Sequence, residues 1–125
     1  MDEEAIARKV IGAAIEVHRH LGPGLMESSY SSALARELAL RGIPAERERA
    51  ITALYKGEPL QDAYRLDFLV AEKVVVELKT VETLLPVHSA QLLTYLRWTG
   101  SRLGLLINFN VPLLRDGIRR IINTL

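Results

Sequence analysis

The sequence of 125 residues contains no cysteine. This absence excludes disulfides, cysteine nucleophiles, iron–sulfur clusters and thiolate zinc sites. No run of residues approaches the ~20 apolar positions that a membrane span requires, so we expect no membrane partner. The chain opens with Met-Asp-Glu-Glu and shows no basic-then-apolar leader. We therefore expect a cytoplasmic protein that is not exported by a signal peptide.

The sequence also lacks a large excess of either charge and several common catalytic motifs. Its formal net charge is +1, so any contact with a polyanion must come from a local patch. It has no phosphate-binding Walker loop and no dinucleotide fingerprint. The serines between positions 28 and 32 lack the glycine elbow and paired histidine of a serine hydrolase. His18 and His20 are two residues apart in an expected helix, so they face different sides and are unsuited to a shared metal.

The composition is that of an ordinary globular protein, with 49% apolar and 25% charged residues. The length fits a single domain over residues 1–125 with a substantial core. No internal repeat, low-complexity tract or linker interrupts it.

Apolar periodicity and turn residues predict an order of helix, helix, three antiparallel strands, helix, strand and helix. The expected helices cover residues 3–20, 25–41, 86–99 and 113–125, and the expected strands cover 45–55, 60–70, 74–80 and 103–109. Since the last strand follows a helical crossover, we expect an α/β (α+β) fold with a central mixed four-stranded sheet flanked by helices.

The most informative stretch is the expected hairpin over residues 64–80, whose apolar strands are interrupted by charges. These are Asp67 in the first strand and Glu77 and Lys79 in the second. A three-residue turn at 71–73 would place Asp67 opposite Glu77, whereas a two-residue turn would put them on opposite faces. Two carboxylates facing each other across a ladder repel. A bound divalent cation would reverse this effect, because hard cations prefer clustered carboxylate oxygens.

Other polar residues allow two interpretations each. Glu27 borders the apolar stripe of the second helix, where it is either a first-turn acid favoured by the helix dipole or part of a site. Gln91 shares a helical stripe with Tyr95 and Trp98. Arg47 and Arg49 lie on one face of an expected edge strand, where they either protect the edge or contact phosphate.

Taken together, these residues resemble a known nuclease family. Asp67 followed by Glu77-Leu78-Lys79 resembles the signature of the PD-(D/E)XK nuclease superfamily. The segments Leu21-Gly22-Pro23-Gly24-Leu25-Met26-Glu27 and His88-Ser89-Ala90-Gln91-Leu92 resemble the GxxExxR proteins within it. The resemblance covers nearly the whole chain and implies a restriction-endonuclease-like core. Two positions depart from it, since Tyr30 stands where the GxxExxR name has arginine, and Leu66, where proline is usual, precedes Asp67.

The resemblance implies roles for six residues. Asp67, Glu77 and the backbone carbonyl of Leu78 would bind Mg²⁺ (or Mn²⁺), and Glu27 would join them through a water. Lys79 would position the nucleophile or stabilise the transition state, and Gln91 would orient that water or the lysine. Simpler interpretations remain open. Glu77 and Lys79 could form a plain ion pair, Gln91 could cap a loop, and His88 could be an ordinary residue at a helix N-terminus.

The resemblance implies a metal-dependent endo- or exonuclease that hydrolyses phosphodiester bonds of DNA or RNA. The alternative is a non-catalytic nucleic-acid or protein interaction module on the same fold. The paired acids favour the nuclease, while the near-neutral charge favours the module. A chain of this length has no room for a separate recognition domain. Sequence specificity would therefore come from a homodimer, another partner or the shape of the substrate.

Overall fold

A computed structural model describes residues 1–124 of the chain. Its elements, in chain order, are α1 (Glu3–Leu21), α2 (Glu27–Leu40), β1 (Ala45–Ile51), β2 (Leu54–Tyr55), β3 (Glu58–Pro59), β4 (Tyr64–Val70), β5 (Val74–Lys79), α3 (Pro86–Thr99), β6 (Leu103–Asn108), the 3-10 turn η1 (Leu114–Gly117) and β7 (Ile118–Ile122). The main sheet has five strands in the order β1-β4-β5-β6-β7. Only the β5–β6 pair within it is parallel.

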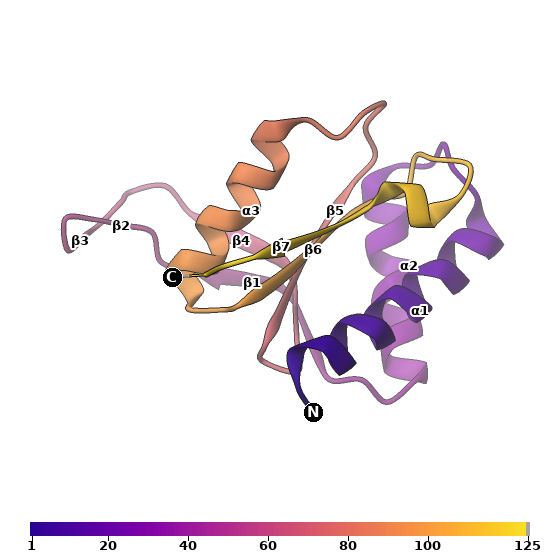
Figure 1. The fold of residues 1–125 in the computed structure, drawn as a ribbon, viewed down its shortest axis with the longest axis horizontal. Coiled ribbons are helices and arrows are strands. Elements are labelled where there is room, and N and C mark those ends of the chain that lie inside the picture. Colours follow the sequence, from indigo (N-terminus) through magenta and orange to yellow (C-terminus); the bar gives the residue numbers. More distant parts are fainter. Residues whose placement is uncertain (125) are drawn as a thin grey trace.

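The helices lie on both faces of this sheet, as the sequence predicted. Figure 1 shows α1 and α2 together on one side and α3 on the other. The helix expected over 86–99 has those bounds in the structure, and α2 begins two residues later than expected, at Glu27. The prediction of a mixed α/β fold is confirmed. Among the helices within residues 1–124, none has the length and apolar character needed to cross a membrane.

Two features of the predicted sheet were wrong. The C-terminal segment forms strand β7 rather than a helix, so the main sheet has five strands and not four. Ile118 packs on the α1/α2 side and Ile121 on the α3 side, which is the alternation of a strand. In addition, the chain between Thr52 and Ala63 leaves the main sheet and forms the small β2–β3 hairpin, which projects from the body in Figure 1.

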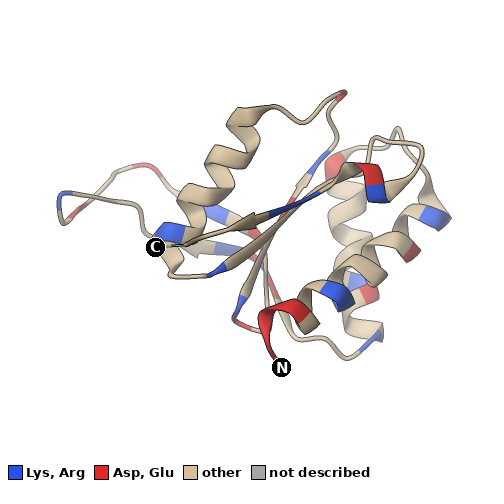
Figure 2. Cartoon of the chain, viewed as in Figure 1, with Lys and Arg blue, Asp and Glu red and all other residues tan. Residues whose placement is uncertain are grey.

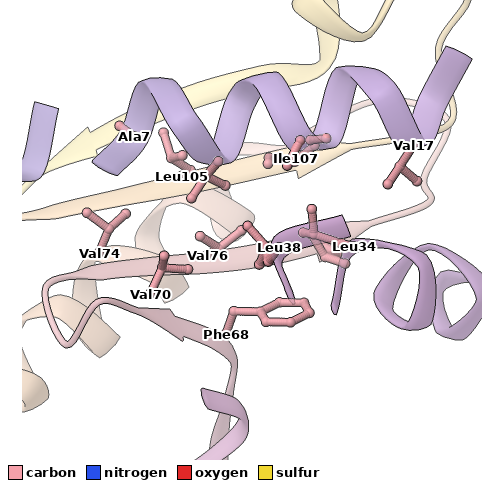
Figure 3. Close-up of a cluster of buried hydrophobic side chains, with 14 of the residues drawn as sticks. Ala7, Val17, Leu34, Leu38, Phe68, Val70, Val74, Val76, Leu105 and Ile107 are labelled. Atoms are coloured by element: carbon pink, nitrogen blue, oxygen red, sulfur yellow. The ribbon is translucent and has the colours of Figure 1, made fainter. Parts of the chain in front are cut away.

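Most of the buried apolar side chains lie between the sheet and helices α1 and α2. Figure 3 shows Val17 of α1, Leu34 of α2 and Val76 of β5 converging in this core. A smaller cluster under α3 contains Leu66, Val75 and Leu92. Full burial of one such side chain stabilises the fold by about 1.5–3 kcal/mol relative to exposure. The central strands β5 and β6 are therefore covered on both faces, whereas the edge strand β1 is largely exposed.

A tight turn fixes the register of the β4–β5 hairpin. Ala71 and Glu72 have positive φ angles of 51° and 60°, and Val70 pairs with Val74. This confirms the three-residue turn. The paired ladder runs from the turn only as far as Phe68 and Val76. Beyond that point Asp67 and Glu77 come next on the two strands.

A second turn fixes the entry into α2. Gly22 and Gly24 have φ angles of 70° and 96°, a conformation that side chains other than glycine rarely adopt. The buried Tyr30 hydroxyl donates a hydrogen bond to the Gly22 carbonyl (2.5 Å) and accepts one from the Leu25 N–H (3.2 Å). The tyrosine ring stacks on Phe109 at 4.5 Å. Tyr30 therefore anchors the turn that sets where Glu27 begins the helix.

Candidate active site

Strands β4 and β5 open where their hydrogen-bonded ladder ends, and two carboxylates lie in the opening. The Asp67 N–H donates to Glu77 Oε2 at 2.7 Å. The Leu78 N–H donates to Asp67 Oδ2, also at 2.7 Å. Each strand thus offers a carboxylate to the backbone of the other where a carbonyl would ordinarily pair. These reciprocal bonds bring Asp67 and Glu77 together and hold them.

Both carboxyl groups are removed from water, and their pKa values respond. Burial raises the pKa of Glu77 to about 8, and the nearby charge of Asp67 adds to this rise. Glu77 is only 6% exposed. Burial also raises the pKa of Asp67, although its bond from the Leu78 N–H and the charge of Lys79 work in the opposite direction. Adjacent desolvated acids of this kind are characteristic of functional sites.

Lys79 lies two residues beyond Glu77 and on the same side of β5. Its positive charge acts to lower the pKa values of Glu27, Asp67 and Glu77. It forms no ion pair within 4.0 Å with any acid of the described chain. The simple Glu77–Lys79 ion pair is therefore not formed, and the ammonium group is free to meet another partner.

Glu27 approaches the same carboxylates from helix α2. Partial burial raises its pKa, and the charge of Asp67 is the next cause. Glu27 and Asp67 line an open hollow of about 200 Å³, together with Ser28, Ser31, Arg47 and Glu48. Glu27 lies in the first turn of the helix and also beside Asp67, so its position is compatible with both interpretations.

Helix α3 presents Tyr95, and not Gln91, to the acids in this structure. Gln91 is exposed, and its side chain makes no hydrogen bond to any residue of 1–124, so it caps no loop. Tyr95 is 6% exposed. Burial raises its pKa, and the charge of Glu77 is the next cause. The shared stripe of Gln91 and Tyr95 was visible in the sequence, but an aromatic residue in such a stripe predicts core packing.

His88 lies in the first turn of α3, as expected for an ordinary residue at a helix N-terminus. Its Nδ1 accepts a hydrogen bond from the Leu85 N–H at 2.9 Å, at the N-terminus of α3.

Asn108, at the end of β6, is a buried polar residue that the sequence did not single out. It is 2% exposed, and its amide donates to the Val81 carbonyl (2.9 Å) and accepts from the Val81 N–H (3.1 Å). The signal for it was a single amide at the end of an apolar strand.

The residues in the opening fit a divalent cation. Asp67 Oδ1 and Glu77 Oε1 have no hydrogen-bond partner in the described chain, and no buried side-chain oxygen there lacks one, so these oxygens reach solvent. The Leu78 side chain packs in the α1/α2 core, which leaves only its backbone at the opening. No group of three or more His, Asp or Glu side chains within residues 1–124 forms a ready-made metal cage. Mg²⁺ needs only one or two carboxylates when water and phosphate complete its shell.

Known proteins are similar to this chain at the level of family and fold. A family profile described as the PD-(D/E)XK nuclease superfamily matches residues 4–121. The crystal structure of an alkaline exonuclease from Laribacter hongkongensis is similar in fold, with a TM-score of 0.50, 16% identity, and coverage of 98% of this chain and 82% of that one. The crystal structure of SSO0001 aligns with a TM-score of 0.48 and 18% identity over 96% of this chain and 79% of that one. No curated protein matches the sequence.

Proposed function

Because the chain belongs to the PD-(D/E)XK nuclease superfamily, we propose that it is a metal-dependent nuclease that hydrolyses phosphodiester bonds of DNA or RNA. Nucleases of this superfamily generally use divalent metal ions. The observation that carries the proposal is the opening between β4 and β5, where Asp67 and Glu77 face each other with raised pKa values beside an unpaired Lys79. Stability alone disfavours such an arrangement. A cation and a phosphate would supply the missing partners.

The GxxExxR proteins are the branch of the superfamily that we propose for this chain. The stretch from Gly24 to Glu27 supports this assignment, because the turn at Gly24 delivers Glu27 to the hollow beside Asp67. Tyr30 takes the place of the arginine in that motif. Its buried hydroxyl holds the same turn, so the position has a structural role here.

Each residue of the opening has a proposed task. Asp67, Glu77 and the Leu78 carbonyl would hold Mg²⁺ or Mn²⁺, which when bound supplies charge stabilisation at the phosphate and a more acidic water. Glu27 would accept a hydrogen bond from a water at the edge of the site. Lys79 would donate to the negative oxygens of the phosphate as charge builds on them. Gln91 is exposed and lies one helical turn before Tyr95 on α3, from which it would orient a water once substrate is present.

Loss of the lysine tests this proposal. We expect Lys79→Ala to reduce cleavage of labelled DNA or RNA in Mg²⁺ or Mn²⁺ by about 100-fold or more, as removal of a transition-state donor does elsewhere. Folding, followed by circular dichroism, should be unchanged, because Lys79 forms no ion pair in the described chain. Lys73→Ala, in the turn that precedes β5, is the control and should cleave normally. Full turnover by Lys79→Ala would remove the lysine from the mechanism.

A non-catalytic interaction module is the second candidate. Figure 2 shows acidic and basic positions interspersed over the helices and strands, and the net charge is only +1. Affinity for nucleic acid rests largely on clustered lysine and arginine, which this distribution does not provide globally. The two candidates separate in one assay, since a module would bind a partner without turning over any nucleic acid in Mg²⁺ or Mn²⁺.

A further inference from the structure

Arg47 donates its side-chain hydrogen bonds to neutral hydroxyls, whereas Arg19, Arg41, Arg49 and Arg120 each lie within 4.0 Å of a carboxylate. Arg47 lies on edge strand β1, and its Nε donates to Ser31 Oγ at 3.0 Å. Its second nitrogen, Nη2, donates to Ser32 Oγ at 3.3 Å. Both hydroxyls belong to α2. The guanidinium is thus fixed in direction while no carboxylate neutralises it within 4.0 Å.

Two residues along the same strand, Arg49 is in the opposite situation. Its Nη1 lies 2.8 Å from each carboxylate oxygen of Glu46. The charge of Arg49 is therefore already matched within β1, while that of Arg47 is not. The two arginines of this edge strand therefore differ in whether their charge has a carboxylate partner.

Arg47 also lines the hollow that contains Asp67. Its neighbours there are Ser28 and Ser31 from α2, and Glu27 and Glu48 complete the wall. The charge of Arg47 is close enough to lower the pKa of Asp67, although burial outweighs it. In the sheet, β1 adjoins β4, and Arg47 is paired with Phe68, the neighbour of Asp67. The strand that carries Arg47 is therefore the neighbour of β4, which carries Asp67, at the usual strand spacing of about 4.8 Å.

The remaining donors of Arg47 suit a phosphate. A guanidinium has five N–H donors, of which the two serines use two, and its fork matches phosphate oxygens. The acids in the hollow oppose an anion when no cation is present. With a divalent cation held by Asp67 and Glu77, Arg47 would be a second positive group without a carboxylate partner beside it, in addition to Lys79. A nucleic-acid strand whose cleaved phosphate lies at Asp67 and Glu77 carries its next phosphates to either side.

We propose that Arg47, held by Ser31 and Ser32, binds a backbone phosphate next to the one that is cleaved. This inference rests on the proposed nuclease function and adds a substrate-binding position on β1. It assigns Arg47 to the sugar–phosphate backbone and not to base recognition, so it acts equally on every sequence. The serines act through Arg47 by fixing the direction of its side chain.

Binding measured without cleavage tests this role. Fluorescence anisotropy would follow a labelled oligonucleotide titrated with full-length protein in Ca²⁺, which shares the preference of Mg²⁺ for oxygen ligands but takes looser geometry. We expect Arg47→Gln to weaken binding by about tenfold, the size of one charged hydrogen-bonded contact. The slope of log affinity against log salt should fall by about 1, because one phosphate contact is lost.

Two further variants complete the design. Arg47→Lys keeps the charge and should retain the salt slope, while Arg49→Gln, the matched control, should leave affinity within about twofold because Glu46 already matches that charge. Equal losses in Arg47→Gln and Arg49→Gln, or no loss in either, would overturn the role of Arg47 while wild-type binding and cleavage keep the proposed function intact. Absence of both wild-type binding and cleavage would overturn the proposed function and this inference with it.

Discussion

Among the acids of the site, Glu77 is the one whose protonation state we expect to change most when a metal binds. Its pKa is raised from 4.5 to about 8, so in the metal-free protein it retains a proton near neutral pH. In the unfolded chain the same carboxyl would lose its proton near pH 4.5. Between these values the folded state binds more protons, so the free energy of unfolding falls as pH rises from about 4.5 to about 8 and then levels off.

Glu77→Gln should remove this contribution, because the amide can still accept the bond from the Asp67 N–H but carries no charge. In chelator-treated buffer at pH 9 we expect the variant to be more stable than wild type, by an order of about 1–3 kcal/mol, while the two are similar at pH 5. Urea unfolding at both pH values measures the difference. Glu58→Gln, an exposed acid on β3, should leave the pH dependence as in wild type. A Glu77→Gln variant that is less stable than wild type at pH 9 would mean that the carboxylate is needed for the fold.

Some site residues could be found in the sequence because they contradict their surroundings. Asp67, Glu77 and Lys79 interrupt apolar strands, and no core-packing pattern accounts for charges there. Tyr95 could not be found in this way, because a buried aromatic on a helix is what packing requires. Its place beside Glu77 depends on how α3 crosses the sheet, which no local pattern encodes.

At the scale of elements, hydrogen bonds from Asn108 and Phe109 hold the chain at the end of strand β5. Asn108 closes two hydrogen bonds on the backbone of Val81, and the Phe109 N–H donates to the Lys79 carbonyl at 3.0 Å. These bonds continue the β5–β6 pairing past Lys79 into the loop that leads to α3. The position of the Lys79 backbone therefore depends on Asn108.

Asn108→Asp keeps the shape of this side chain but removes the donor to the Val81 carbonyl and puts a carboxylate oxygen against it. We expect a loss of about 1–3 kcal/mol in the free energy of unfolding at pH 8, with a smaller loss at pH 4, where the acid can regain a donor proton. Thermal unfolding at the two pH values measures it. Asn110→Asp is the control, since Asn110 is exposed and the hydrogen bond from its side-chain amide to the Val81 carbonyl is long, at 3.5 Å. Equal stability of the two variants would contradict the role given to Asn108.

The secondary structure of the C-terminal segment could not be predicted from its own sequence. Ile118, Ile121 and Ile122 are spaced by three and four residues, which also fits a helix. So short a helix gains little by itself. The segment pairs along β6 instead, where Ile118 lies opposite Ile107. The free edge of β6 determines that this segment forms a strand. The periodicity of the segment itself carries no information about that edge.

At the scale of the whole molecule, one end of the sheet gathers groups that are far apart in the sequence. Helix α2 supplies Glu27, β4 supplies Asp67, β5 supplies Glu77 and Lys79, and α3 supplies Tyr95. The helices α1 to α3 and the strands β1, β4, β5 and β6 could be predicted in order, since each has its own periodicity and turn residues, whereas the β2–β3 hairpin and β7 could not. Only the family resemblance suggested that α2 lies near the β4–β5 hairpin. No local sequence pattern predicts this position, because it depends on how the helix and the sheet bury their shared core.

The central claim is that this end of the sheet is a carboxylate site for a divalent cation. Calorimetric titration of Mn²⁺ into chelator-stripped wild type and Glu77→Gln, at pH 7 in two buffers of different ionisation heat, tests it most directly. We predict that wild type binds Mn²⁺ and releases about one proton per ion, because the Glu77 carboxyl, with its pKa of about 8, must ionise to bind. Glu77→Gln should show neither the binding nor the proton release. Equal binding by both proteins, or none by wild type with or without a short DNA duplex, would contradict the claim.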